Sequence, residues 1–519
     1  MKIKLLSIIM LLGAVSANAQ SATQDPLDGV TNVRIDVAAA DGRIIPKEIY
    51  GQFSEHLGSC IYGGLWVGKD SPIPNQDGYR LDVLNALKKL QVPVLRWPGG
   101  CFADDYHWMD GIGPQEKRTK ISNNNWGGTI EDNSFGTHEF LNLCELLGCE
   151  PYISGNVGSG TPEELAKWVE YMTSDSQSTV ADMRRANGRE KAWKVKYLGI
   201  GNEAWGCGGN MRPEYYADLF RRYTTYTRNY GGRLYKIASG ASDFDYNWTE
   251  VLMKAIGNKM DAIAMHYYTV LDWNKKGSAT AFSEDEYMRI LQRCVGIEGC
   301  IQNHIAIMDR LDPRKRINLL VDEWGTWFDV EPGTNPGHLF QQSTMRDAIV
   351  AGLSFNIFHK YTDRIKMANI AQIVNVLQAM ILTDGPKMLL TPTYHVFEMY
   401  KVFQDAEFIP VEFNAGSIKS ADGAVEVPAL SVTAARKDGK TYVAIVNTDL
   451  KASRTVSLSA DKALSRADGR VLTAKDIHEF NDFTNGNKVA PKEFKGSKRT
   501  RNGLELTVPA MSVTVVEVR

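Results

Sequence analysis

The chain has 519 residues, and its 59 Lys and Arg against 61 Asp and Glu give a formal net charge of −2. A chain so close to neutral has no general electrostatic attraction for nucleic acid or an anionic membrane, so we expect neither as a partner. With 43% hydrophobic and 23% charged residues, it has the composition of a soluble globular protein. Its length exceeds what one hydrophobic core accommodates, and we therefore expect two domains.

The first residues have the pattern of a signal peptide. Lys2 and Lys4 form a positive region before the apolar run LLSIIMLLGAV, and ANAQ offers an Ala-x-Ala cleavage site after Ala19. The alternative is a membrane anchor, but the run is short for a hydrocarbon layer of roughly 30 Å. We therefore expect residues 1–19 to be a cleavable signal peptide of a secreted or periplasmic protein.

Between residues 46 and 395, short apolar strands alternate with helical patterns such as LDVLNALKKL (81–90) and TPEELAKWVEYM (161–172), the latter with Thr161 as its N-cap. The expected strands are 48–56, 92–100, 150–158, 195–204, 236–242, 262–269, 317–326 and 365–372. Eight such alternations favour an α/β fold, a (β/α)₈ TIM barrel. An open doubly wound sheet is the alternative, but no Gly-rich phosphate loop follows an early strand.

After residue 396 the pattern changes to strict alternation of apolar and polar residues, with turns at Asp438-Gly439 and Asn502-Gly503. This pattern predicts a C-terminal antiparallel β-sandwich domain over 396–519. The segment VTNVRIDVAAADG (30–42) alternates in the same way. We expect the N-terminal stretch 20–45 to supply a strand to the sandwich.

The chain has seven cysteines, an odd number, so at least one is free or pairs between chains. Cys144 with Cys149 and Cys294 with Cys300 are close enough in sequence to pair. Neither spacing is a metal-binding signature, and no His–Cys cluster has one. We expect no metal or other cofactor.

In a TIM barrel the active site forms at the carboxyl ends of the strands. Glu203, in YLGIGNEAW, and Glu323, in INLLVDEWGT, each end an apolar strand. A tryptophan follows each of them, two residues after Glu203 and directly after Glu323. Two carboxyl groups that face each other suit glycoside hydrolysis, because one protonates the leaving oxygen while the other attacks or assists at the anomeric carbon. The strand ends therefore predict a glycosidase.

Several longer motifs carry a family resemblance. GIGNEAWGCGG and LLVDEWGTWFD resemble the strand-four and strand-seven signatures of a large clan of retaining (β/α)₈ glycosidases. YGQFSEHLGSCIYGGLWVG, RWPGGCFADDYHWMDGIGP, MHYYT and ANIAQIVNVLQAMILTDG resemble, more narrowly, the α-L-arabinofuranosidases of glycoside hydrolase family 51. The resemblance implies an exo-acting enzyme that releases arabinofuranose from arabinan, arabinoxylan or their oligosaccharides through a covalent arabinosyl-enzyme.

The resemblance also implies roles for single residues. It makes Glu203 the general acid/base, which we expect to be protonated because it faces Trp205 and the anionic Glu323, and it makes Glu323 the nucleophile. The implied substrate-binding residues are Glu55, Arg96, Cys101, Trp126, Asn202, His266, Tyr268 and Gln372. Cys101 stands where many family members have Asn, and because a thiol is a weak donor we expect it only to line the pocket.

Two other functions stay open from the sequence. Another retaining glycosidase of the same clan, an endo-glucanase or a β-xylosidase, would share both glutamate signatures. A carbohydrate-binding protein without activity is the alternative from a different class. Family 51 members are commonly oligomeric, so a homo-oligomer is possible, and the sequence does not identify the natural polymer.

Overall fold

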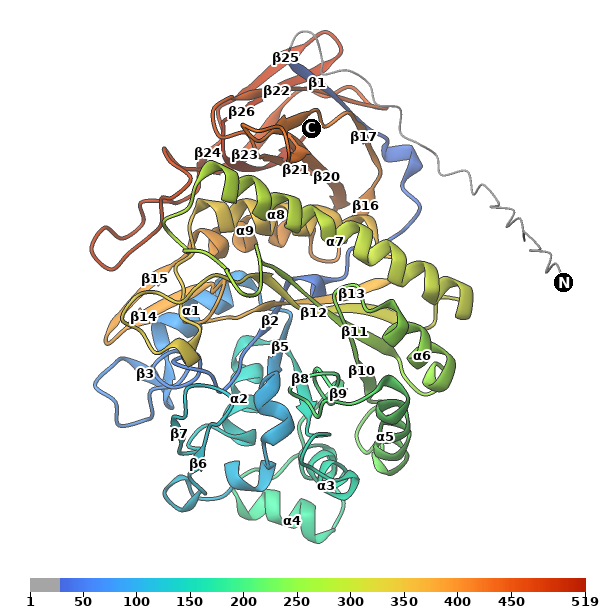
Figure 1. Cartoon of the computed structure of the whole chain (residues 1–519), viewed down its shortest axis with the longest axis vertical. Helices are drawn as coiled ribbons and strands as arrows, with labels where there is room; N and C mark the ends of the chain where they lie inside the picture. Colours follow the sequence, from blue (N-terminus) through green and yellow to red (C-terminus); the bar gives the residue numbers. More distant parts are fainter. Residues whose placement is uncertain (1–28) are drawn as a thin grey trace, which may run out of the picture.

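The structure is a computed structural model, and it describes residues 29–519 (Figure 1). The expected signal peptide, residues 1–19, lies outside the described residues. Two parts are visible in Figure 1: a barrel surrounded by helices, and a pair of sheets packed against one side of it. None of the helices in residues 29–519 is both long enough and apolar enough to cross a membrane.

Eight parallel strands form a closed barrel in chain order, because the last strand pairs with the first. They are β2 (Gly51–Phe53), β5 (Val94–Trp97), β8 (Glu150–Gly155), β9 (Tyr197–Ile200), β10 (Tyr235–Ser242), β11 (Ala262–Thr269), β12 (Asn318–Thr326) and β13 (Ile365–Ala371). The closure confirms the TIM barrel and excludes the open doubly wound sheet. Nearly every residue of these strands is buried, as expected for parallel strands covered on both faces.

The helices around the barrel follow their sequence patterns. In α1, Val83, Leu84, Leu87 and Leu90 are buried, and their spacing places them on one face. The expected cap of α3 is confirmed, since Thr161 Oγ1 accepts a hydrogen bond from the Glu164 N–H at 3.1 Å. The nine α-helices of the described residues are α1 (Leu81–Leu90), α2 (Thr137–Leu147), α3 (Pro162–Thr173), α4 (Thr179–Ala186), α5 (Pro213–Tyr226), α6 (Tyr246–Ile256), α7 (Glu284–Leu311), α8 (Met345–Lys360) and α9 (Pro392–Tyr400).

The interior of the barrel is filled near the amino ends of its strands. Tyr197 is the first residue of β9, and Tyr152, Ile237 and Leu320 are each third in their strands. These side chains form a buried cluster with Val94, Ala262, Ala264 and Met367. Packing of this end leaves the carboxyl ends of the strands for polar side chains.

The second part is a sandwich of two sheets. One sheet has the order β17 (Val411–Phe413), β1 (Val30–Ile35), β22 (Arg454–Ala460), β26 (Gly503–Val508), β25 (Ser497–Thr500). The other has the order β16 (Glu407–Ile409), β20 (Leu430–Lys437), β21 (Lys440–Asn447), β27 (Ser512–Val518), β23 (Ala467–Thr473), β24 (Lys492–Glu493). Alternate residues such as Val33 and Ile35 of β1, or Val456 and Leu458 of β22, enter its core.

One feature of the sandwich differs from the expectation. β1 pairs antiparallel with β17 but parallel with β22, so the sandwich is mostly and not wholly antiparallel. The parallel pair is possible because β1 comes from the other end of the chain and needs no tight turn to reach its neighbour. The domain divisions at 45/46 and 395/396 stay a prediction, and helix α9 runs through the second of them.

Helix α8 lies between the barrel and the six-stranded sheet, and it packs against β20, β21 and β27 (Figure 1). Every residue of α8 except Lys360 is buried, as in a helix with protein on all sides. A Cβ at Gly352 would lie 2.8 Å from Val446 Cγ2, so glycine is needed for this close approach.

Among the described residues, four short antiparallel strand pairs lie outside the barrel and the sandwich. They are β3 (Asn75–Gln76) with β4 (Tyr79–Arg80), β6 (Ile121–Ser122) with β7 (Ile130–Glu131), β14 (Ile381–Asp384) with β15 (Lys387–Leu390), and β18 (Ser417–Lys419) with β19 (Glu426–Pro428).

Candidate active site

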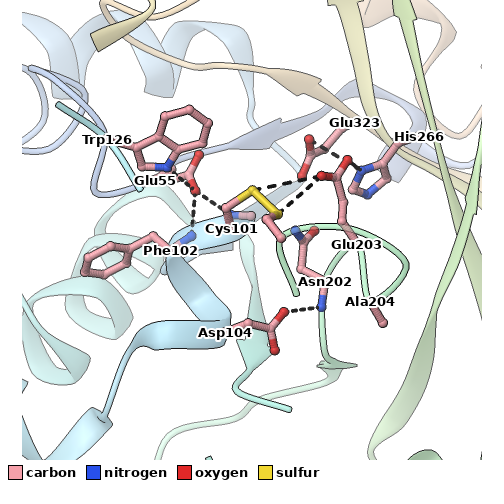
Figure 2. The surroundings of a disulfide bond; sticks show 12 residues. Glu55, Cys101, Phe102, Asp104, Trp126, Asn202, Glu203, Ala204, His266 and Glu323 are labelled. Carbon is pink, nitrogen blue, oxygen red and sulfur yellow. Dashed lines mark hydrogen bonds and ion pairs between the residues drawn. A yellow bond between two sulfur atoms is a disulfide. The ribbon is translucent and has the colours of Figure 1, made fainter. Parts of the chain in front are cut away.

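The two expected catalytic glutamates meet at the carboxyl end of the barrel (Figure 2). Glu323 lies near the end of β12, and Glu203 follows β9 after a short turn. One carboxylate oxygen from each, together with a ring nitrogen of His266, lie within 4.8 Å of one another. The barrel thus brings together two acids that are far apart in the sequence.

Glu323 is buried and surrounded by donors. Arg96 Nη1 donates to its Oε1 at 2.8 Å, and the Tyr268 hydroxyl donates to its Oε2 at 2.6 Å. Burial alone would raise the pKa of Glu323, but the charges of His266 and Arg96 and the Tyr268 hydrogen bond outweigh it and lower the pKa. Glu323 is therefore held in the ionised form that a nucleophile requires.

The Glu203 side chain, after β9, faces His266 of β11. His266 Nδ1 lies 2.8 Å from Glu203 Oε1 and 3.5 Å from Glu323 Oε2. Burial opposes a charged imidazole, but Glu323 and Glu203 together raise the pKa of His266 above its usual 6.5. The two carboxylates therefore favour the protonated, charged form of His266.

Arg96 connects the nucleophile side of the site to Asn202. Its Nη2 donates to Asn202 Oδ1 at 2.5 Å, and its Nε donates to Ser154 Oγ at 3.2 Å. Asn202 Nδ2 is buried and has no hydrogen-bond partner among the described residues. A buried amide donor without a partner is costly, so this atom is a candidate to bind a ligand.

Glu55, after β2, forms the other wall of the site. Its Oε1 accepts from Gly100 N–H at 2.9 Å, Phe102 N–H at 3.2 Å and Trp126 Nε1 at 3.0 Å, while Gln372 Nε2 donates to its Oε2 at 2.8 Å. Burial and the charge of Glu323 raise the pKa of Glu55 to about 7, against these hydrogen bonds. Gln372 Oε1 is buried without a partner, so it is a second unsatisfied polar atom in the site.

Two glycines allow these groups to approach each other. A Cβ at Gly99 would lie 2.6 Å from Glu55 Cγ, and one at Gly100 would lie 2.9 Å from Glu323 Oε1 and 3.4 Å from Asn202 Nδ2. The space above the nucleophile therefore exists because residue 100 has no side chain.

Cys101 differs from our expectation of a free thiol that lines the pocket. It forms a disulfide with Cys207, 106 residues further along the chain, and both sulfurs lie beside Glu203 (Figure 2). The remaining five cysteines, Cys60, Cys144, Cys149, Cys294 and Cys300, are free and buried. The pairs that the sequence made possible, 144 with 149 and 294 with 300, do not form.

The structure places all ten of the expected site residues in this one region, and adds others that the sequence analysis did not single out. Asp322 accepts hydrogen bonds from Tyr152 and Asn369 at 2.6 Å each, directly behind Arg96. Asp104 accepts from the backbone N–H groups of Val157, Gly158 and Asn202. For Asp322 the signal that could have identified it is a charged residue inside an apolar strand, as in LLVDEW.

Two clusters of described residues offer three possible metal ligands each: Cys101, Glu203 and Cys207, and Glu203, His266 and Glu323. In the first, both sulfurs are bonded to each other and neither is a thiolate. In the second, Glu323 is already bonded by Arg96, whose positive charge opposes a cation. The expectation of no metal cofactor stays a prediction.

Comparison with known proteins identifies α-L-arabinofuranosidase domains in both halves of the chain. Residues 86–287 match the model described as "Alpha-L-arabinofuranosidase 1 domain", and residues 322–512 match "Alpha-L-arabinofuranosidase C-terminal domain". An "intracellular exo-alpha-L-arabinofuranosidase" of Bacteroides ovatus is 58% identical over 525 residues, covering 100% of both chains.

Solved structures agree. The family 51 arabinofuranosidase of Xanthomonas axonopodis pv. citri has a TM-score of 0.92 and 49% identity, over 94% of this chain and 100% of that one. An arabinose complex of the α-L-arabinofuranosidase of Thermotoga maritima has a TM-score of 0.79 and 30% identity, over 94% and 99% of the two chains.

These comparisons correct our expectation of the protein's location. We expected a secreted or periplasmic protein with a cleavable signal peptide, and this expectation is wrong. The Bacteroides ovatus relative matches over the full length of both chains and is named an intracellular enzyme.

Proposed function

The chain belongs to the α-L-arabinofuranosidases of glycoside hydrolase family 51, and we propose that Glu323 is its nucleophile and Glu203 its general acid/base. It is an exo-acting, retaining arabinofuranosidase. The observation that carries our assignment of the two residues is their proximity, since one carboxylate oxygen of Glu203 and one of Glu323 lie within 4.8 Å of each other. Retaining glycosidases hold these groups about 5–5.5 Å apart, whereas inverting ones need roughly 6.5–9.5 Å to fit a water molecule.

In the first step of the proposed reaction, a Glu323 oxygen attacks the anomeric carbon of the terminal arabinofuranose. Arg96 and Tyr268, which donate to the two oxygens of Glu323, keep the carboxylate ionised and fix its direction. Glu203 gives its proton to the glycosidic oxygen as that bond breaks. This step leaves Glu203 as a carboxylate, which His266 Nδ1 faces at 2.8 Å.

In the second step, water attacks the arabinosyl ester on Glu323. Glu203, left as a carboxylate by the first step, acts as the base that takes a proton from the attacking water, and this returns Glu203 to its acid form. The sugar leaves with its original anomeric configuration, and both carboxyl groups return to their starting states.

The polar atoms without partners support the binding of a sugar. We assign the buried Asn202 Nδ2 as a donor to a hydroxyl of the arabinose, and Gln372 Oε1 as an acceptor from one. Within residues 29–519, Glu55 Oε2 accepts a hydrogen bond only from Gln372, so it can accept another from the sugar. Trp126, held by its hydrogen bond to Glu55, provides a flat apolar face near the sugar.

Replacing His266 by Asn tests the electrostatics of the site. The variant loses a charge that lowers the pKa of Glu323, so this pKa should rise. Because Glu323 must be ionised to attack, the acidic limb of the profile of kcat/KM against pH is expected to move to higher pH. The same measurement on His107→Asn, an exposed histidine bound to Glu164 outside the site, should give an unshifted limb. An unshifted limb in His266→Asn would contradict the proposed role.

Glu55 gives a pH dependence of stability with a defined sign. Its pKa rises from 4.5 to about 7 on folding, so the folded state binds the proton more tightly than the unfolded state. Its stabilising contribution is therefore present below pH 4.5 and is lost as the pH rises towards 7. The melting temperature of the wild type, relative to Glu55→Gln, is expected to fall by on the order of 3 °C across that range.

Calorimetry at a series of pH values measures this difference between the two proteins. Glu412→Gln, a change at an exposed glutamate of the sandwich, is the matched control and should follow the wild type. A difference between wild type and Glu55→Gln that is constant with pH would contradict the raised pKa.

We propose arabinan, arabinoxylan or their oligosaccharides as the source of the arabinose. Family membership supports this over the alternative of an endo-glucanase or a β-xylosidase. Rates on 4-nitrophenyl α-L-arabinofuranoside, β-D-xylopyranoside and β-D-glucopyranoside separate these functions, and arabinose release from the two polymers identifies the source. A homo-oligomer stays a prediction, which light scattering on the purified chain tests.

A further inference from the structure

The Cys101–Cys207 disulfide joins two loops that meet at Glu203. Cys101 opens the 3₁₀ helix η3 (Cys101–Asp105), which follows β5, and Cys207 lies in the loop between β9 and α5. Glu203 lies in that second loop, between the end of β9 and Cys207. The disulfide is therefore attached directly to the segment that carries the general acid/base.

The backbone at Glu203 depends on this loop. Glu203 has a φ of 38°, in the left-handed region that non-glycine residues rarely adopt. Its carbonyl accepts hydrogen bonds from the N–H groups of Gly206 at 2.7 Å and Gly208 at 3.1 Å. A conformation of this kind persists only where the surrounding structure holds it.

Helix η3 holds the same segment at a second point. Asp104 Oδ2 accepts from the Asn202 N–H at 2.7 Å, just before Glu203, while Cys101 is bonded to Cys207 just after it (Figure 2). Glu203 is thus fixed between two attachments to one short helix. The hydrogen bond fixes its amino side, and the disulfide fixes its carboxyl side.

The sulfurs also contact the reacting carboxyl group. Cys207 Sγ lies 3.4 Å and Cys101 Sγ 4.0 Å from Glu203 Oε2, while His266 faces Oε1. A disulfide has no S–H, so these contacts are packing and not hydrogen bonds. The disulfide sulfurs therefore donate no hydrogen bond to Oε2. This leaves Oε2 as the oxygen of Glu203 that can carry the proton for a leaving group.

We infer that the Cys101–Cys207 disulfide positions Glu203 for leaving-group protonation, so that reduction of the disulfide impairs this step selectively. The inference rests on the proposed acid/base role of Glu203. Reduction frees the loop after Glu203, and it also creates two thiols that can donate hydrogen bonds to Oε2 and so favour the carboxylate over the acid that protonates the leaving group. Cys101 and Cys207 are positioning residues, since they act through Glu203.

The chemistry needs a dithiol reductant. A dithiol thiolate attacks one sulfur, the Cys101–Cys207 bond breaks, and the second thiol of the reductant closes a cyclic disulfide. Two electrons and two protons pass to the protein, which then holds two thiols. Cys207 is exposed and Cys101 half-buried, so a small dithiol can reach them, whereas the free cysteines are buried.

The test treats the native full chain with dithiothreitol and counts two newly accessible thiols per chain with a thiol reagent. The ratio kcat/KM is then measured on an arabino-oligosaccharide and on 2,4-dinitrophenyl α-L-arabinofuranoside, whose leaving group needs no proton. We expect a loss of roughly 10- to 100-fold on the first substrate and less than about 3-fold on the second, because a small displacement of a catalytic group has effects of this size. Reoxidation should restore the activity.

The Cys101→Ala/Cys207→Ala variant is the matched control, and it should show the same selective loss without any response to the dithiol. If that variant fails to fold, reduction of the wild type with dithiothreitol still tests the role of the disulfide. Verified reduction with no loss, or with equal losses on both substrates, overturns the inference. Glu203→Ala measured in parallel separates the two claims: if it is selective and the reduced enzyme is not, only the role of the disulfide fails.

Discussion

Replacing Glu323 by Gln is expected to lower kcat/KM by at least about 10⁴-fold on every arabinoside, whatever its leaving group. The amide of Gln cannot attack the anomeric carbon as a carboxylate does, and no second carboxylate occupies its place between Arg96 and Tyr268 in the described site. The loss should be equal on activated and natural substrates, because both need the same covalent bond.

Kinetics on a natural oligosaccharide and on an aryl arabinofuranoside measure this effect. Glu412→Gln, in the sandwich, is the control for an unrelated glutamate and should keep full activity. Substantial turnover of the aryl substrate by a folded Glu323→Gln enzyme would show that the nucleophile is elsewhere.

Replacing Glu203 by Ala is expected to separate the two kinds of substrate. On natural arabinosides kcat/KM should fall by about 10²- to 10⁴-fold, the usual contribution of a general acid. On 2,4-dinitrophenyl α-L-arabinofuranoside it should fall by less than about tenfold, because this leaving group departs without a proton. The difference follows from the position of Glu203 opposite Glu323, within 4.8 Å.

A small anion such as azide should accelerate the second step in Glu203→Ala, since it needs no base, and yield an arabinosyl azide. The control is Glu323→Gln, which azide should not rescue in this way. Equal losses of kcat/KM on both substrates in Glu203→Ala would remove the acid/base assignment.

The barrel, and the position of the active site at the carboxyl ends of its strands, could be predicted from the sequence because each strand has a recognisable pattern. Strands such as 262–269 and 318–326 are short apolar runs with polar residues at or after their carboxyl ends. Parallel strands that close into a barrel bring those ends together, so Glu203 and Glu323 could be placed in one site without knowing any distance. The family resemblance added the roles of the surrounding residues.

The disulfide could not be predicted, for a physical reason. Cys101 and Cys207 are 106 residues apart, and only the closed barrel brings the loops after β5 and β9 together. Nearness in sequence favoured Cys144 with Cys149 instead, but these lie in a helix and just before a strand and remain free. Spacing along the chain gives no orientation of the two Cβ atoms.

The parallel pairing of β1 with β22 in the sandwich could not be predicted from the sequence either. Alternation at Val33 and Ile35 shows which side chains enter the core, but it is the same for parallel and antiparallel neighbours. The unpaired atoms Asn202 Nδ2 and Gln372 Oε1 likewise required the structure, since a sequence shows an amide but not which of its atoms lacks a partner.

Mass spectrometry of the covalent intermediate tests the central claim most directly. The Glu203→Ala enzyme is mixed with 2,4-dinitrophenyl α-L-arabinofuranoside, which forms the intermediate quickly but, without a base, hydrolyses it slowly. We predict that the protein gains the mass of one arabinosyl residue and that peptide mapping places it on Glu323. A label on any other residue, or rapid turnover through inversion of configuration without a label, would contradict the account.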